Sequence, residues 1–311
     1  MTHPASHIPN LFIAGAPKCG TFSMYEYLRQ HPQVFFPDRK EPNFFNRDMP
    51  EVSKISEAEY LGLYAAAPAE ARWLGDATPL YMMSEVAARN IAAISPDARI
   101  VIMLRRPADL LLSVYQHNQA SGVETLPTFE EALAAENDRR AGRNLPKGVT
   151  HTHRFLYRDF AQFSSQIERF LEHFGRERVH FILYDDFRKD TPGAFDRLLD
   201  FLGLEKGHPI RFEIHNAARK SRSPFLKKLL KYPPPAVSAA ARLLLPASLR
   251  RRIFQSASNA LTTKADKTPM LQATENQLVE EFRSEVERLE KLIGRDLSGW
   301  QKTRNHAHVA V

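Results

Sequence analysis

The sequence has 311 residues, a formal net charge of +7 and a pI near 9.5. Its hydrophobic content of 43% and charged content of 25% are ordinary for a globular protein, and no apolar run approaches the ~18 residues that span a bilayer. The first residues lack the basic start and apolar core of a signal peptide, and the single cysteine, Cys19, excludes an intrachain disulfide. We therefore expect a cytoplasmic protein. The positive charge favours an anionic partner, which leaves nucleic acid, a phosphorylated nucleotide, an acidic glycan and a membrane surface open.

The first pattern along the chain predicts a strand, a small-residue turn and a helix. Residues 11–14 form an apolar run, residues 15–20 include two glycines and Lys18, and helical spacing begins at Thr21. Such a turn lets backbone N–H groups converge at a helix N-terminus, where the dipole adds about half a positive charge. The pattern therefore predicts an anion site. The alternative is an ordinary strand-to-helix turn with a solvated lysine.

The segment 38–45 places charged residues beside the aromatic pair Phe44 and Phe45. Apolar walls around Glu41 would raise the pKa of its carboxyl and make it a usable general base. The alternative is a surface turn whose aromatic side chains pack inward.

The next segments predict a helix over 51–71, a short strand and loop over 73–81, and a helix over about 84–94. The loop brings polar groups to the place where parallel strands usually present functional side chains. These groups are Asp76, Thr78 and Tyr81.

Residues 99–104 predict the clearest buried strand of the chain. The strand runs into Arg105, Arg106 and Pro107, and Pro107 suits the first turn of a helix that also carries Ser113. An arginine at this junction offers a planar donor fork for phosphate. The alternative is a structural arginine paired with an acidic neighbour.

The remaining pattern alternates strands and helices. A loop-rich insertion over about 121–150 contains a short helix at about 128–140, and its neighbouring histidines lack a third ligand at metal spacing, so we expect no metal site. Further segments are a helical pattern at 155–174, a strand at 179–184 and a helix at about 191–203. This alternation predicts a three-layer α/β fold, in which a mostly parallel sheet is flanked by helices and carries a P-loop-like phosphate-binding turn.

The last third of the chain differs in composition. A basic loop at 216–223 precedes a basic helical segment at about 223–265, which suits either a membrane or acidic-glycan surface or a helical hairpin solvated on one side. A capping box at Thr274 predicts the start of a C-terminal helix that ends at Gly294, and Trp300 is expected to pack back on the body.

Three segments in order carry a family resemblance: the turn at 15–21, the segment Lys40-Glu-Pro-Asn-Phe-Phe45, and the strand that ends at Arg105 with Ser113 eight residues on. Together they resemble the sulfotransferases that use 3′-phosphoadenosine 5′-phosphosulfate (PAPS), and are closest to the Golgi heparan-type branch and its bacterial relatives. The resemblance runs from about residue 10 to 300. It implies a single sulfotransferase domain over 1–311 with the insertion and the basic segment named above.

The resemblance also implies residue roles. Glu41 would be the catalytic base and Lys18 would stabilise the leaving phosphate, with no metal required. Contacts with the acceptor, a saccharide or else a lipid or natural-product hydroxyl, are expected from Asn43, Asp76 and Tyr81. The residues expected to bind PAPS, and its product 3′-phosphoadenosine 5′-phosphate (PAP), are Pro17, Lys18, Cys19, Gly20, Thr21, Phe22, Ser23, Arg105, Ser113, Lys220 and Arg222.

Two other functions compete with sulfuryl transfer. A nucleotide kinase or NTPase of the P-loop class would need Gly-Lys-Ser/Thr at the end of the loop and an acidic strand end for magnesium. Here Lys18 precedes Gly20, and the strand at 99–104 runs into arginine. A basic glycan- or nucleic-acid-binding protein is the second alternative, although the sequence contains no nucleic-acid-binding motif.

Overall fold

The structure is a computed structural model that describes residues 8–49, 55–147, 149, 152–213, 219–221, 262–264 and 270–304. The chain divides into two compact units. The first comprises residues 1–111, 156–215 and 271–311, and the second comprises 112–155 and 216–270. The single-domain organisation that the sequence indicates stays a prediction.

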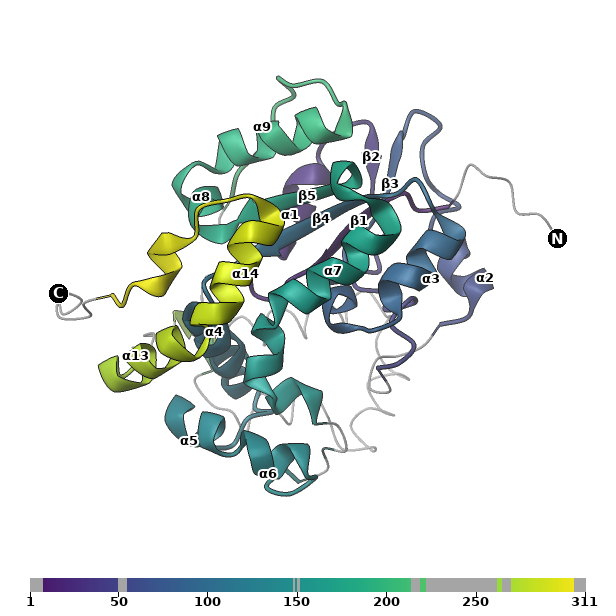
Figure 1. Ribbon diagram of the computed structural model, residues 1–311. Coiled ribbons are helices and arrows are strands. Elements are labelled where there is room, and N and C mark those ends of the chain that lie inside the picture. The colour runs from purple at the N-terminus through teal and green to yellow at the C-terminus, as the bar shows by residue number, and fades with distance from the viewer. Residues whose placement is uncertain are drawn as a thin grey trace. The chain divides into compact units, whose positions relative to one another are not determined.

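The first unit is built on a five-stranded sheet in the order β2-β3-β1-β4-β5 (Figure 1). Every neighbouring pair in this sheet is parallel. Nearly all side chains of the central strands are buried, because both faces of a parallel sheet are covered. The strands are β1 (Leu11–Gly15), β2 (Val34–Phe35), β3 (Trp73–Asp76), β4 (Arg99–Leu104) and β5 (Val179–Leu183).

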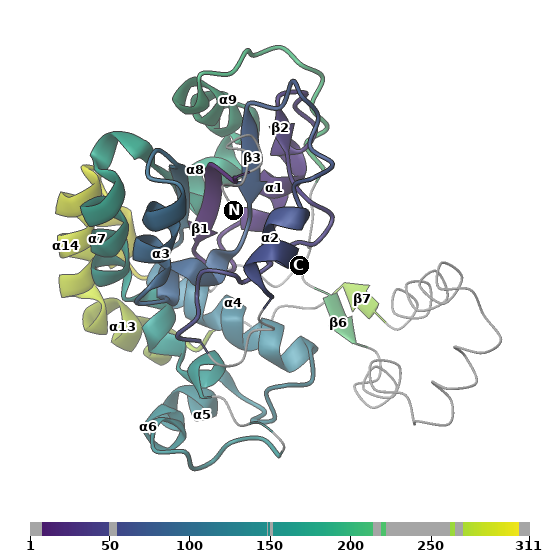
Figure 2. The same ribbon diagram turned by 90° about the vertical axis from the view of Figure 1, so that its right-hand side faces the viewer.

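Helices cover both faces of this sheet, which confirms the predicted three-layer α/β fold. One face is covered by α3 (Ala87–Ile94) and α7 (Phe163–Phe174), with α14 (Arg283–Ile293) on the outer side of α7 (Figure 2). On the other face, α1 (Thr21–Leu28) packs against β1. The remaining helices of this unit include α2 (Glu57–Gly62), η2 (Pro79–Met83), η4 (Tyr157–Ala161), η5 (Arg176–Arg178), α8 (Tyr184–Lys189), α9 (Thr191–Leu202), α13 (Gln272–Glu281) and η6 (Ser298–Gln301).

The second unit begins within α4 (Pro107–Ala120) and contains the predicted short helix as two pieces, α5 (Phe129–Ala134) and α6 (Glu136–Arg140). It also holds η3 (His153–Phe155) and an antiparallel pair of β6 (Arg219–Ser221) with β7 (Thr262–Lys264). Inside this unit the buried side chains of Arg139 and Glu124 form a bidentate ion pair at 2.7 and 2.8 Å. The predicted basic helical segment lies outside the described residues except at β7.

Several predicted elements are wrong in extent. Of the helix expected over 51–71, the described residues 55–71 contain only α2, and the chain forms turns at residues 63–66. The capping box predicted at Thr274 does not form, because Thr274 lies inside α13. The N-cap of α13 is Leu271, whose side chain makes no capping hydrogen bond in the described chain. The predicted C-terminal helix also breaks at Phe282, although it ends at Gly294 as expected.

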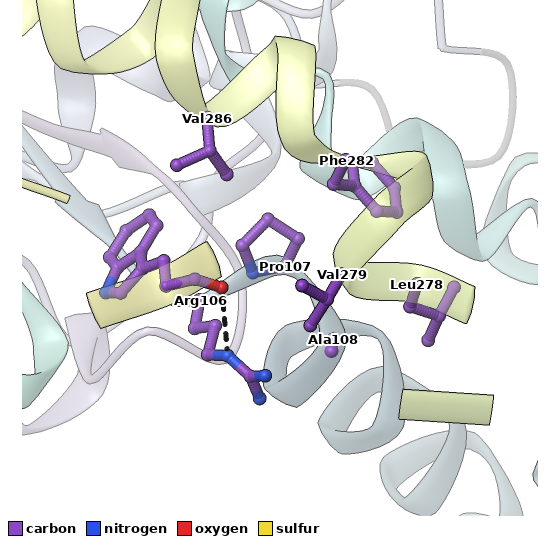
Figure 3. Close-up of a pocket in the computed structure, with 8 residues that line it drawn as sticks. Arg106, Pro107, Ala108, Leu278, Val279, Phe282 and Val286 are labelled. Carbon is purple, nitrogen blue, oxygen red and sulfur yellow. Dashed lines mark hydrogen bonds between the residues drawn. The ribbon is translucent and has the colours of Figure 1, made fainter. Parts of the chain in front are cut away.

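The C-terminal helices pack against the start of α4 around Arg106, Val279 and Phe282 (Figure 3). Trp300 lines the same place. The cavity among these side chains measures about 10 Å³, which is about the room of one water molecule. Trp300 thus packs on the body of the first unit as predicted. Within the described part of the chain, no helix combines the length and apolarity that a bilayer crossing requires.

Candidate active site

The predicted strand–turn–helix is confirmed between β1 and α1. Ala16 N donates to Met103 O at 2.7 Å, which fixes the start of the turn against β4. Lys18 and Gly20 both have left-handed backbones, with φ of 65° and 93°, and α1 begins directly after Gly20 as its N-cap. A Cβ at Gly20 would come within 3.1 Å of the Phe187 ring, so both conformation and space favour glycine here. The turn therefore presents Lys18 at a helix N-terminus.

Lys18 lies among like charges. Burial lowers the pKa of its ammonium group, the nearby Arg105 and Lys40 lower it further, and Cys19 and Glu41 act in the opposite direction. Arg105 approaches through a 3.4 Å hydrogen bond from its Nη1 to Lys18 O. An anion bound in this turn would offset both the burial and the repulsion, so the electrostatics of the turn suit a phosphate or sulfate group.

The two neighbouring arginines at the end of β4 have different surroundings. The Arg105 guanidinium lies 4.8 Å from the centroid of the Tyr184 ring. Arg106 is 1% exposed and pairs with the buried Glu275 at 2.7 Å. The interpretation as a structural arginine therefore fits Arg106, and Arg105 is the arginine that borders the Lys18 turn.

Glu41 lies on a surface turn, and the expectation that apolar walls bury it is wrong. Its side chain is 43% exposed and contacts Lys40 Nζ. The aromatic residues Phe44 and Phe45 pack inward and are 4% and 1% exposed. The alternative interpretation of this segment, a surface turn with buried aromatics, is the one that the structure supports. Glu41 is near enough to Lys18 to influence the pKa of Lys18, so the two side chains belong to one candidate site.

Lys40 is a member of this site that sequence analysis missed. Its ammonium group lies 5.3 Å from the Phe22 ring centroid and 5.9 Å from that of Tyr25, both on α1. These cation–π contacts join the Glu41 turn to the helix that follows the Lys18 turn. The position of Lys40 directly before Glu41 in the sequence was the signal that could have identified it as a site residue.

Asn43 holds the backbone of the same turn. Its Nδ2 donates to Glu41 O at 2.6 Å, and its Oδ1 accepts from Asn46 Nδ2 at 3.2 Å. Both Glu41 and Asn43 have left-handed backbones, with φ of 54° and 56°. Among the described residues only four non-glycine residues have positive φ, and three of them, Lys18, Glu41 and Asn43, belong to this site.

Asp76 and Tyr81 are buried beneath the Glu41 turn, at 1% and 0% exposure. The Asp76 carboxylate accepts hydrogen bonds from the hydroxyls of Tyr60, Thr78 and Tyr81 at 2.8, 2.6 and 2.7 Å. Burial raises the pKa of the Asp76 carboxyl to about 6, and the three hydroxyl hydrogen bonds oppose that rise.

The other predicted residues divide into three groups. Pro17 and Cys19 lie in the turn, and burial raises the pKa of the Cys19 thiol to about 12, which makes it a passive neutral side chain. The first turn of α1 is formed by Thr21, Phe22 and Ser23. In the second unit, Ser113 is half-buried on α4 and Lys220 belongs to β6, whereas Arg222 lies outside the described residues.

A parallel α/β sheet with a cation-bearing turn at a helix N-terminus defines a phosphate-binding class of fold. The family model of the sulfotransferase domain matches residues 9–228. This match covers more than half of the 311 residues. The chain therefore belongs to the sulfotransferase domain family, and the resemblance that the sequence indicated is confirmed.

Individual relatives agree with this assignment. Heparan sulfate glucosamine 3-O-sulfotransferase 3B1 of Homo sapiens is 26% identical over 202 residues, which are 65% of this chain and 48% of that protein. The bifunctional heparan sulfate N-deacetylase/N-sulfotransferase 2 of Bos taurus is 28% identical over 206 residues, which are 63% of this chain and 22% of that protein. The chain thus spans about half the length, or less, of these relatives.

The fold has a counterpart among solved structures. The crystal structure of a sulfotransferase from Alicyclobacillus acidocaldarius superposes with a TM-score of 0.71 at 28% identity. The superposition covers 94% of this chain and 99% of that one. Sulfotransferases of this family use PAPS as the sulfuryl donor.

Proposed function

We propose that this chain transfers a sulfuryl group from PAPS to an acceptor hydroxyl or amine by in-line displacement. The observation that carries the proposal is the position of Lys18. It lies at a strand-to-helix turn, where burial and Arg105 lower its pKa, and Glu41 lies close by. The 5′-phosphosulfate of PAPS supplies the negative charge that such a turn lacks.

The reaction uses one base and one cation. The acceptor atom attacks sulfur opposite the phosphate oxygen, so that a bond to sulfur forms, the bond from sulfur to phosphate oxygen breaks, and the electron pair stays on PAP. Glu41 takes the acceptor proton. Lys18 and the N-terminus of α1 stabilise the charge that develops on the leaving oxygen, and Arg105 contributes positive charge to donor binding.

A saccharide is the acceptor that we favour. The relatives named above are heparan sulfate sulfotransferases, and the exposed position of Glu41 suits an acceptor that approaches from solvent. The competing class of acceptor is a lipid or natural-product hydroxyl. The roles given to Ser113, Lys220 and Arg222 in donor binding stay predictions from the sequence.

The base assignment is tested by replacing Glu41→Gln, which keeps the size of the side chain but removes its basicity. We expect turnover to fall by about 10²–10⁴-fold while PAP binding is retained. Transfer of ³⁵S from labelled PAPS to desulfated heparan oligosaccharides and to small phenols measures turnover, and calorimetry measures PAP binding. Glu70→Gln, at an exposed position, is the matched control. Full turnover of Glu41→Gln would exclude Glu41 as the base.

A further inference from the structure

The buried cluster around Asp76 leads directly to the turn that carries Glu41. Asp76 closes β3, and Tyr81 follows within η2 (Pro79–Met83). The Tyr81 hydroxyl donates to Asp76 Oδ2 at 2.7 Å and accepts from the backbone N–H of Phe44 at 3.2 Å. One hydroxyl thus joins a buried carboxylate of the sheet to the backbone of the catalytic turn.

The direction of this chain of hydrogen bonds is fixed by proton count. A tyrosine hydroxyl has one proton, and the Tyr81 proton is given to Asp76. The Tyr81 oxygen therefore accepts a hydrogen bond from the Phe44 N–H. This direction has no alternative, because a backbone N–H group can only donate. Hydrogen bonds in such a chain polarise one another, so the ionised Asp76 strengthens the hold of Tyr81 on Phe44.

The turn needs such a hold because its backbone is unfavourable. Glu41 and Asn43 have left-handed φ values of 54° and 56°, which non-glycine residues adopt only where surrounding structure enforces them. Asn43 fixes the turn from within through its bond to Glu41 O, and Tyr81 fixes it from the sheet through Phe44. The Tyr81 side chain is 0% exposed, so its hydroxyl contacts protein groups and not solvent.

We propose that Tyr81 is a positioning residue for sulfuryl transfer, whose hydroxyl holds the Phe44 amide so that the Glu41 carboxylate faces the acceptor. Asp76 is the anchor of this arrangement. The inference rests on the proposed role of Glu41 as the base, and it assigns Tyr81 and Asp76 to the support of Glu41 in place of the acceptor contacts expected from the sequence.

A matched control is present in the same cluster. The Tyr60 hydroxyl also donates to Asp76 Oδ2, at 2.8 Å, and the Tyr60 ring stacks on Phe44 at 4.3 Å between centroids. Tyr60→Phe removes a hydroxyl from the same carboxylate and keeps the ring. Tyr81→Phe makes the same chemical change but removes the acceptor for Phe44 N–H. The comparison separates support of the turn from general stability of the cluster.

The test measures kcat and KM for Tyr81→Phe, Tyr60→Phe, Glu41→Gln and the double variant Glu41→Gln/Tyr81→Phe. Turnover is followed as ³⁵S transfer to a desulfated heparan oligosaccharide and as release of PAP from PAPS into water. We expect Tyr81→Phe to lower kcat by about 10–100-fold, since a small misplacement of a catalytic group has that effect, with little change in PAP affinity. Tyr60→Phe should retain kcat within about threefold. In the Glu41→Gln background Tyr81→Phe should cause no further loss, because the two act as a unit.

Two results would overturn the inference while leaving the proposed function intact. In one, Glu41→Gln is impaired but Tyr81→Phe loses no more activity than Tyr60→Phe. In the other, Tyr81→Phe causes the same fold loss with and without Glu41, which would indicate an independent or merely structural role. By contrast, full activity of Glu41→Gln would contradict the base assignment itself, and the inference with it.

Discussion

Lys18, Glu41 and Asn43 share a left-handed backbone, at φ of 65°, 54° and 56°. Each such residue stores strain on the order of 1–3 kcal/mol, which persists only where neighbouring contacts enforce it. Here the neighbours are the sheet and the turn itself, through Ala16, Phe44 and the Asn43 side chain. Strain at the proposed cation and the proposed base is consistent with a site arranged before its ligands bind.

Asp76 makes the stability of the protein depend on pH in an unusual direction. Its pKa of about 6 in the folded protein is above the ordinary value of 3.8, so the folded state holds the proton more tightly than the unfolded state. The stabilisation that protonation provides is therefore fully present below about pH 4 and is lost as pH rises through about 6. The groups around the carboxyl are the hydroxyls of Tyr60, Thr78 and Tyr81, with Glu41 adding a negative charge nearby.

We predict that this dependence disappears in Asp76→Asn. The free energy of unfolding of wild type, minus that of Asp76→Asn, should fall by on the order of 3 kcal/mol between pH 4 and pH 7, because one pKa unit corresponds to about 1.4 kcal/mol. Urea unfolding at closely spaced pH values measures the difference. Asp38→Asn, at a fully exposed side chain, is the control. A difference that is constant or rises with pH would contradict the raised pKa.

At the scale of elements, short apolar runs were the most informative part of the sequence. The strands β1, β4 and β5 and the start of α1 were predicted within a residue or two, because buried parallel strands read as continuous apolar runs. Tyr184 was assigned to the last of these strands but begins α8, because the pairing of β4 with β5 ends at Leu104 and Leu183.

Elements that depend on tertiary contacts were predicted less well. The capping-box pattern at Thr274 has the right residue types, but Glu275 pairs with the distant Arg106, and both Thr274 and Glu275 are buried inside α13. A capping box does form at Ser56 with Glu59, at the start of α2, and its Ser-x-x-Glu pattern was available in the sequence. Local patterns therefore indicate caps only where no long-range partner competes.

Gly75 on β3 lies in close contact with Phe36, the residue after β2, so the addition of one methyl group at Gly75 should strongly reduce stability. A Cβ at Gly75 would overlap the Phe36 ring, which packs edge-on against Tyr25 at 4.9 Å and has little room to move. We expect Gly75→Ala to lower the free energy of unfolding by about 3 kcal/mol, as overpacking does. Gly62→Ala, with nothing within 4 Å of its added methyl, should change it little. Urea unfolding gives both values, and equal effects would show that the ring adapts.

At the scale of the molecule, Arg106 connects the C-terminal segment to the sheet within the first unit. Its guanidinium pairs with Glu275 on α13 at 2.7 Å and donates to Trp300 O and Lys302 O at 3.2 and 2.8 Å. Arg106 comes two residues after the end of β4 and is the sequence neighbour of Arg105. One junction therefore supplies both a structural arginine and an arginine at the candidate active site.

Removing one partner of the buried Arg106–Glu275 pair should lower the free energy of unfolding more than removing both partners. We expect Arg106→Met to lower the free energy of unfolding by about 3–5 kcal/mol, because the Glu275 charge loses its counter-charge in a dry environment. The double variant Arg106→Met/Glu275→Met should recover much of that loss. Urea unfolding of the two variants provides the comparison. If the double variant is as unstable as the single one, the carbonyl hydrogen bonds of Arg106 outweigh its ion pair.

The candidate site itself was partly predictable. Its cations and its proposed base lie in short segments whose order along the chain identified them, and the structure brings Lys18, Arg105 and Glu41 together. The exposure of Glu41 on a surface turn was one of the two interpretations that the sequence offered. The hydrogen bonds that lead from Asp76 through Tyr81 to this turn were not predictable, because they depend on how distant strands and turns meet. Residue type indicates chemistry, whereas burial and partners arise from packing.

The ligand preference of the Lys18 turn is the sharpest test of the proposed PAPS-dependent transfer. Calorimetric titration of the wild-type protein with PAP, and separately with ATP and magnesium, compares a sulfotransferase product with the ligand of a P-loop kinase. We predict that PAP binds more tightly than ATP with magnesium, and that Lys18→Ala weakens PAP binding by at least about tenfold, since a charged hydrogen bond is lost. Lys206→Ala, at an exposed ion pair, should leave binding unchanged. Tighter binding of ATP with magnesium would contradict the proposed donor, and undiminished PAP binding by Lys18→Ala would contradict the role of Lys18 in holding it.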